Sequence, residues 1–188
     1  MSHFEVRIAG MGGQGIIMAA VMIGRAASIF GGKNVTLTQS YGPESRGGAC
    51  KAEVIVSDER VDYPKVRQPS LIAIMSEEAY QKNISNSNSG AIVVIDPDMV
   101  KEDQSYTHAK IFRVPATRIA EDLGKRIVAN MVMVGAIVAL TDMVDLAAVE
   151  KAIAKYTPRG TEKLNLDAFR NGYEFARKLR EEQMVNAQ

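Results

Sequence analysis

A glycine-rich turn near the N-terminus constrains this chain more than any other stretch. An apolar run ends at Ala9, Gly10, Gly12 and Gly15 follow in the spacing G-x-G-x-x-G, and a helical pattern then continues to about Phe30. A strand, a glycine turn and a helix in this order give that spacing its meaning. Glycine lets a backbone turn tightly beside a ligand, and the free N–H groups of a helix start favour an anion. The stretch predicts an anion-binding turn whose candidate cofactor-binding residues are Gly12, Gly13, Gln14 and Gly15.

The same turn also has a structural interpretation, in which the glycines only bring the helix close to the sheet. Its surroundings exclude two common nucleotide-binding motifs. A nicotinamide-binding domain carries an Asp or Glu about 20 residues after the glycines, but the second strand, residues 34–39, is followed by Ser40 and supplies no acid. The phosphate loop of nucleoside triphosphatases needs Lys and then Ser or Thr after its last glycine, whereas Ile16 and Ile17 follow Gly15. The turn is therefore not an ordinary dinucleotide site, although it is suited to cradle a phosphate.

A second glycine-rich segment, residues 40–49, follows the second strand. It reads Ser-Tyr-Gly-Pro-Glu-Ser-Arg-Gly-Gly-Ala, a composition that excludes regular structure. A guanidinium beside open backbone N–H groups is suited to bind an anion. In a parallel pair of the first two strands, both glycine segments would lie at the carboxyl edge of the sheet, where ligands of α/β proteins bind. The alternative is a solvated loop with a local ion pair between its acid and its arginine. The candidate cofactor-binding residues are Ser45, Arg46 and Gly47, and the candidate contacts with a partner or ligand are Tyr41 and Glu44.

The composition is that of a folded globular protein. The chain has 188 residues, of which 46% are hydrophobic and 24% charged, ordinary values for a soluble domain, and we expect a single domain over residues 1–188. A formal charge of +1 argues against an obligate nucleic-acid binder. The longest apolar stretch, residues 127–140, is too short to span a bilayer. The N-terminus lacks the basic start and apolar run of a secretory signal.

Cys50 is the only cysteine of the chain. It excludes an intrachain disulfide and favours a reducing, cytoplasmic location. One thiolate cannot assemble an iron–sulfur cluster, which typically needs several. Cys50 lies on the apolar face of an alternating strand, residues 50–57, so we expect a packed, inert thiol rather than a nucleophile. Because the other face of that strand is more polar, we expect it at an edge of the sheet, paired antiparallel.

The rest of the chain alternates strands with helices. Residues 70–75 and 91–95 are apolar runs typical of buried strands, the second of them central and parallel. A further strand is expected over residues 110–115, and helices over residues 116–125, 127–140, 145–156 and 161–183. The pattern predicts an α/β protein: a three-layer α/β/α fold with a mostly parallel, mixed central sheet and a helical C-terminal third.

No residue stands out as a proton-transfer group or metal ligand. Asp96 ends a core strand, but Pro97 follows it, which favours a turn. Asn130 lies in the apolar helix, where a buried amide needs hydrogen-bond partners. It caps a neighbouring backbone or meets a ligand, and is a third candidate contact with a partner or ligand. His3 and His108 are too isolated to suggest a metal site. We predict no catalytic residue and no metal site.

Three segments together resemble a known family. Residues 10–15, 40–48 and 130–135 are similar to the gamma subunit of 2-oxoacid:ferredoxin oxidoreductases, which corresponds to one domain of the single-chain pyruvate enzymes. Residues 165–172 are similar to the family's C-terminal pattern. The segments occur in the right order over nearly the whole chain, and residues 40–48 are the most specific.

The resemblance implies a domain that works inside an assembly. Such complexes convert a 2-oxoacid, such as 2-oxoglutarate or pyruvate, and coenzyme A into an acyl-coenzyme A and carbon dioxide, and they reduce ferredoxin. Thiamine diphosphate, magnesium and the iron–sulfur clusters would belong to partners, namely thiamine-binding alpha and beta subunits and a small ferredoxin-like subunit. This chain would line the active site and help to accommodate coenzyme A, and would be inactive alone. Its brevity and nearly charge-free first helix point towards the 2-oxoglutarate type or a related oxoacid type.

Two other functions are compatible with the sequence. One is a self-sufficient nucleotide-binding enzyme with an unusual ribose contact. The other is an oligomeric scaffold in which the glycine turns only pack against neighbours. The residues alone reveal neither the oxoacid nor the subunit stoichiometry.

Overall fold

A six-stranded mixed sheet runs through the molecule, in the order β2-β3-β1-β4-β5-β6. The structure is a computed structural model that describes residues 3–42, 48–86, 90–102 and 110–185. The strands are β1 (His3–Met11), β2 (Asn34–Tyr41), β3 (Ala49–Ser57), β4 (Leu71–Ile74), β5 (Ile92–Ile95) and β6 (Lys110–Arg113).

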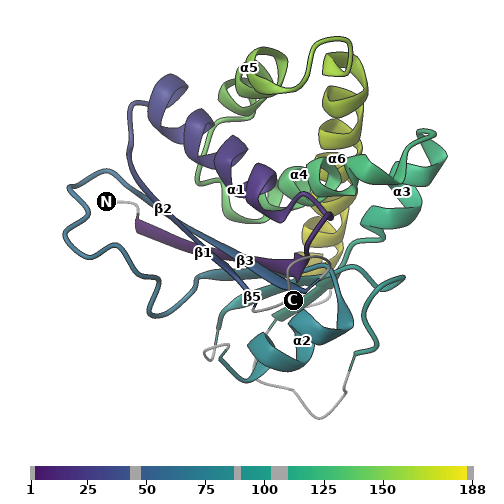
Figure 1. Ribbon diagram of the computed structural model, residues 1–188, viewed down its shortest axis with the longest axis horizontal. Helices are drawn as coiled ribbons and strands as arrows, with labels where there is room; N and C mark the ends of the chain where they lie inside the picture. The colour runs from purple at the N-terminus through teal and green to yellow at the C-terminus, as the bar shows by residue number, and fades with distance from the viewer. Residues whose placement is uncertain (1–2, 43–47, 87–89, 103–109, 186–188) are drawn as a thin grey trace.

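Helices cover both faces of this sheet. They are α1 (Ile16–Arg25) with the π-helical turn η1 (Ala26–Phe30), α2 (Glu77–Asn83) with the short η2 (Ile84–Asn86), α3 (Ala116–Asp122), η3 (Arg126–Val128), α4 (Ala129–Thr141), α5 (Leu146–Tyr156) and α6 (Glu162–Val185). Figure 1 shows α1, α4, α5 and α6 on one face, and α2 on the other. The predicted α/β class and the helical C-terminal third are confirmed.

The sheet is parallel in one half and antiparallel in the other. β4, β5 and β6 continue β1 in parallel, whereas β3 is antiparallel to both β1 and β2. The predicted antiparallel pairing of residues 50–57 is correct, but the predicted edge position is wrong, because β2 is the edge strand. An interior place is possible because Glu53 of β3 lies opposite Arg7 of β1 and binds it. That pairing partner is distant in sequence.

The main core lies between the sheet and the four-helix face. Every residue of α4 from Ala129 to Leu140 is buried, and α1 packs against the sheet on one side and against α4 and α5 on the other. This double cover explains why α1 is apolar nearly all round. Gly135 of α4 and Gly172 of α6 meet where the two helices cross, and a Cβ at either position would overlap the other helix's backbone.

Three local predictions need comment. The helix expected over residues 116–125 ends at Asp122, because Gly124 takes a left-handed φ of +92°. Asp145, whose residue type and place predict a cap for the helix over residues 145–156, precedes α5 but makes no side-chain capping hydrogen bond. Asp96 is fully buried, and its carboxylate accepts hydrogen bonds from the Thr117 backbone N–H at 2.8 Å and hydroxyl at 2.7 Å. Its other carboxylate oxygen accepts from the Asp98 N–H at 3.1 Å, and this local contact agrees with the turn-forming interpretation of Asp96.

Candidate functional site

The carboxyl ends of β1 and β2 lie at the same edge of the sheet. β2 runs in the direction of β1 because both are antiparallel to the strand between them. The Gly12 N–H donates to the Gly48 carbonyl at 2.9 Å, and the Gly42 N–H donates to the Ala49 carbonyl at 2.7 Å. The described ends of the second glycine segment are therefore attached to the first. Residues 44–47, which include Glu44, Ser45, Arg46 and Gly47, lie outside the described residues, and their roles stay predictions.

The Gln14 side chain braces the glycine turn internally. Its Oε1 accepts from the Met11 N–H at 2.7 Å, and its Nε2 donates to the Met75 carbonyl at 2.6 Å. The amide thus links the end of β1 to the residue after β4. The chain continues from β1 to α1 on one face of the sheet, and from β4 to α2 on the other face. In an open α/β sheet this switch point is the usual ligand crevice. Gln14 is used there to shape the turn.

Gly15 and Asn130 belong to one contact. Gly15 precedes α1 with a left-handed φ of +74° and no side-chain cap. The Asn130 Nδ2 donates to its carbonyl at 3.3 Å, and a Cβ on Gly15 would overlap that amide group. The backbone-capping alternative considered for Asn130 is the one that the described contacts support. The three motif segments, far apart in sequence, therefore converge on one turn.

The remaining glycines of the turn divide into two kinds. Gly10 is a packing glycine, since a Cβ there would lie 2.7 Å from Ile16 Cδ1 and would also press on Gln14. Gly12 and Gly13 are exposed. Gly13 has a left-handed φ of +94° and open space around its Cα. The structural and functional interpretations of the motif therefore apply to different glycines, and Gly12 and Gly13 are accessible to a ligand or partner.

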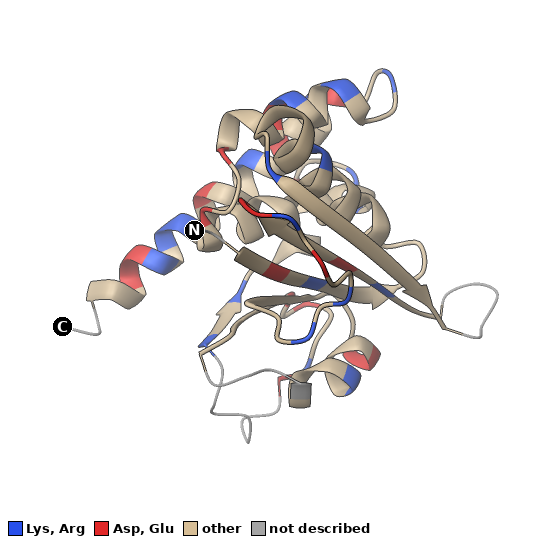
Figure 2. Cartoon of the chain, turned by 90° about the vertical axis from the view of Figure 1, so that its left-hand side faces the viewer, with Lys and Arg blue, Asp and Glu red and all other residues tan. Residues whose placement is uncertain are grey.

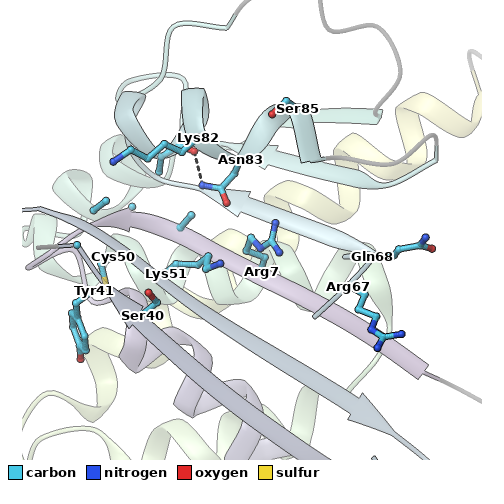
Figure 3. Close-up of a pocket in the computed structure, with 15 residues that line it drawn as sticks. Arg7, Ser40, Tyr41, Cys50, Lys51, Arg67, Gln68, Lys82, Asn83 and Ser85 are labelled. Atoms are coloured by element: carbon cyan, nitrogen blue, oxygen red, sulfur yellow. Dashed lines mark hydrogen bonds between the residues drawn. The ribbon is translucent and has the colours of Figure 1, made fainter. Parts of the chain in front are cut away.

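A cavity of about 630 Å³ opens beside this edge, between α2 and the exposed part of the sheet (Figure 3). The ends of β2 and β3 border it through Tyr41, Gly42 and Ala49. Tyr41 is 64% exposed, and Ser40 and Cys50 complete this side of the wall. Every charged residue among the described lining residues is basic: Arg7, Lys51, Arg67 and Lys82. We call this space the cationic cavity.

The four cations are held in place by neighbours outside the cavity wall. Arg7 is buried, and its Nε donates to Glu53 Oε1 at 2.8 Å. Lys51 Nζ lies 3.3 Å from the same carboxylate oxygen. The Arg67 guanidinium lies 4.2 Å from the centre of the Tyr63 ring, and Lys82 Nζ lies 2.5 Å from Glu78 Oε1. One carboxylate thus serves two cations, which leaves the cavity wall electropositive and suited to a polyanion.

A smaller cavity of about 300 Å³ lies on the other side of the Gln14 brace. Gly13, Gln14 and Met75 form one wall, and Thr117, Arg126 and Ile127 form the other. Ile127 is 61% exposed. The glycine turn therefore stands between two hollows, one lined by cations and one mixed.

Sequence reasoning did not find the cationic cavity. Its charges come from β1, β3, the connection before β4, and α2, so no single motif contains them. One signal was present: Arg7 stands between the apolar residues Val6 and Ile8, and Glu53 stands between Ala52 and Val54. A charge inside a core strand needs a partner, and these two residues are each other's partner.

The described residues contain no evident catalytic set. No group of three or more His, Cys, Asp or Glu side chains within the described ranges could hold a metal ion. Cys50 is buried, and burial raises the pKa of its thiol, as expected of a packed cysteine. In the part of the chain that the structure describes, no helix is both long and apolar enough to cross a membrane.

The sequence matches the Pyruvate ferredoxin/flavodoxin oxidoreductase family over residues 5–175. Among curated relatives, 2-oxoglutarate synthase subunit KorC of Methanocaldococcus jannaschii is 46% identical over 93% of this chain and 95% of its own length. Ketoisovalerate oxidoreductase subunit VorA of Methanothermobacter thermautotrophicus is 32% identical over 92% of this chain, but the match occupies only 36% of that longer protein.

A solved structure agrees with these relatives. The keto/oxoacid ferredoxin oxidoreductase gamma subunit from Geobacter sulfurreducens superposes with a TM-score of 0.82 at 38% identity, covering 92% of this chain and 98% of that one. Fold, sequence and the three converging segments point the same way. This chain belongs to the pyruvate ferredoxin/flavodoxin oxidoreductase family, as a gamma subunit of the 2-oxoacid:ferredoxin oxidoreductase type.

Proposed function

We propose that this chain serves a complex that oxidises 2-oxoglutarate with coenzyme A and reduces ferredoxin. The relative at 46% identity, matched over 95% of its length, is a subunit of 2-oxoglutarate synthase, and this similarity carries the choice of oxoacid. A complex purified with this chain is expected to turn over 2-oxoglutarate with a kcat/KM at least ten times that for pyruvate or ketoisovalerate. A preference for either of the other oxoacids would overturn the assignment.

Within that complex, the chain's role is to line the active site and to accommodate coenzyme A. The single observation that carries this is the cationic cavity beside the glycine turn. Coenzyme A presents three phosphate groups on its nucleotide end, and Arg and Lys are the usual partners of such groups. Gly12 is hydrogen-bonded to Gly48, which precedes Ala49 of the cavity wall. Ser45, Arg46 and Gly47 belong to the stretch of sequence between Gly42 and Ala49, both of which line the cavity.

The redox chemistry belongs to groups on the partner subunits. A chain with one buried cysteine does not fit an iron–sulfur cluster of its own, and the described residues offer no metal cluster. The resemblance to the family assigns thiamine diphosphate, magnesium and the clusters to the alpha, beta and ferredoxin-like subunits, where they would supply the decarboxylation and electron transfer. This chain binds and orients coenzyme A and lines the active site. Purified alone, it is expected to show no oxoacid-dependent dye reduction.

The test measures steady-state kinetics of the reconstituted complex with Lys51→Gln and Arg67→Gln in this chain. Each variant is expected to raise the KM for coenzyme A about two- to fivefold, the effect of losing one partly screened charge contact of up to about 1 kcal/mol. The KM for the oxoacid and kcat should stay unchanged. Lys151→Gln, an exposed lysine on α5 outside the cavity wall, is the matched control. If Lys51→Gln and Arg67→Gln raise the KM for coenzyme A no more than Lys151→Gln does, the cavity is excluded as the coenzyme A site.

A further inference from the structure

The two outer edges of the sheet differ in their protection against pairing with another chain. β6, at one edge, has four residues and carries Lys110 and Arg113, and the Arg113 guanidinium donates to both oxygens of Glu102 at 2.7 Å. β2, at the other edge, has eight residues and contains no charge, proline or glycine (Figure 2). Short length, charge and proline are the features that keep edge strands from pairing. β2 has none of them.

An apolar groove follows the unprotected edge. It lies between α1 and β2, has a volume of about 230 Å³, and is lined by Val21, Gly24, Arg25, Ser28, Val35 and Leu37. Gly24 lies against β2, and a Cβ there would make ordinary van der Waals contact with a Val35 methyl group at 3.4 Å. Met18, three residues before Val21 in α1, is 40% exposed, and Ile29, which follows Ser28 in the chain, is 53% exposed. Two large apolar side chains and a free strand edge thus occupy one side of the molecule.

The relatives show that this domain also occurs within a longer polypeptide. It is matched by 36% of the VorA sequence, whereas KorC is a separate chain of nearly the same length as this one. Where the domain is a separate chain, non-covalent contacts alone must hold it against the rest of the complex. An interface of that kind is apolar at its centre and depleted of charge. The β2 side is similar: Arg25 is the one charged residue among the described groove residues, and its guanidinium lies 4.2 Å from the centre of the Tyr156 ring.

We propose that β2 is the docking edge for an extended segment of a partner subunit, namely the chain that corresponds to the remainder of the longer relatives. The segment adds a seventh strand next to β2, and its backbone satisfies the free N–H and C=O groups of the edge. Alternate side chains of the segment point to the α1 face, and one apolar side chain fills the groove between Val21 and Leu37. This inference rests on the proposed function, because it takes its partner from that complex.

A second copy of this chain fits the edge less well. Val35 and Leu37 already line their own groove, so in a pair of β2 strands they are not free to fill the groove of the other copy. The next β2 residue on that face is Gln39, which is polar. In a pair of β2 strands from two copies, the Gln39 amide would therefore be the group that faces the apolar groove of the other copy.

The test uses co-purification of the complex with two variants of this chain. Ile29→Glu places a charge on the exposed apolar side, and Thr36→Lys adds the kind of charge that blocks edge pairing. Each is expected to weaken assembly with the partner at least tenfold while leaving the thermal unfolding of the isolated chain unchanged. Met184→Glu, at a residue of α6 that is 61% exposed, makes the same kind of change elsewhere and should assemble normally. Normal assembly of both β2-side variants would overturn the proposal.

Hydrogen exchange on the wild-type chain gives a second measurement that does not depend on variants. Backbone N–H groups of β2 that face away from β3 should exchange at least ten times more slowly in the complex than in the isolated chain. Unchanged exchange in a complex that forms would reject the docking edge and leave the proposed function intact. Failure of the wild-type chain to assemble with any 2-oxoacid oxidoreductase subunit would reject the proposed function itself. An isolated chain that dimerises, and that Thr36→Lys makes monomeric without affecting the complex, would assign the edge to a second copy.

Discussion

The two faces of the β2-β3-β1 half of the sheet are built from the same strands and have opposite character. On the α1 face, Val6 and Ile8 of β1 join the main core with alternate residues of β3. On the other face, Arg7 and Glu53 stand in the same two strands, and no helix of the described chain covers the neighbouring β2. One face is packed for stability, whereas the other carries charges that a core would not tolerate unpaired. The difference shows which face stabilises the fold and which is available for a ligand.

The largest expected effect lies in the packed face. Gly172→Ala forces a methyl group into the Val132 backbone where α6 crosses α4, and neither backbone can move away without separating the helices. We expect a loss of about 3 kcal/mol or more in the free energy of unfolding, measured by urea denaturation. Asn171→Ala, at the exposed neighbouring position, should change it by less than about 0.5 kcal/mol. Equal effects would mean that the crossing is not tightly packed.

The charged face should respond differently to single and paired changes. Glu53→Gln leaves Arg7 buried beside a neutral amide and is expected to cost about 2 to 3 kcal/mol of unfolding free energy. Arg7→Met combined with Glu53→Leu removes both charges, and should restore stability to within about 1 kcal/mol of the wild type. The paired variant should nevertheless bind coenzyme A more weakly in the complex. A paired variant as unstable as the single one would show that the charges serve the fold.

A smaller effect is expected at the turn between the two faces. Gly13 and Gly15 both have left-handed φ angles, but only Gly15 faces Asn130. Gly13→Ala should cost about 1 to 2 kcal/mol, the penalty of that conformation alone, and Gly15→Ala should cost about 1 kcal/mol more because of the added contact. Combining Gly15→Ala with Asn130→Ala should recover that excess. If the destabilisations caused by Gly15→Ala and Asn130→Ala simply add in thermal unfolding, the predicted contact between the two residues is wrong.

The smallest effect concerns Cys50, which belongs to the packed core and also borders the cationic cavity. Because burial raises the pKa of the thiol, its thiolate fraction at pH 8 is lower than that of an ordinary cysteine. Labelling by a disulfide reagent at pH 8 should therefore be slow in the native chain and at least ten times faster in denaturant. Rapid labelling of the native chain would mean that the Cys50 thiol is more accessible from the cationic cavity than the structure shows.

Local patterns predicted most elements, because each depends on neighbouring residues. The buried parallel strands, the first helix and the helical C-terminal third follow from apolar runs and glycine positions. The interior place of β3 could not be predicted in the same way. Its charged residues resemble those of an edge strand until Arg7, more than forty residues earlier in the chain, is known to pair with Glu53.

The site was only partly predictable for the same reason. Residues 10–15 and 40–48 are each contiguous, so their glycines follow directly from the sequence. Their shared edge of the sheet was expected from a parallel pairing of the first two strands, whereas β3 lies between β1 and β2. Whether Gln14 faces a ligand or braces the turn depends on the Met75 carbonyl, 61 residues away. The cations of the cavity come from four separate segments, and only the fold brings them together.

The contact of Asn130 with Gly15 has a consequence for how the chain matures during synthesis. The glycine turn leaves the ribosome first, but the helix that supplies Asn130 emerges more than a hundred residues later. That helix is in turn held by α6, through the crossing at Gly135 and Gly172. The part of the molecule that is translated first is therefore completed last, and a nascent chain released early would lack a finished turn to offer its partners.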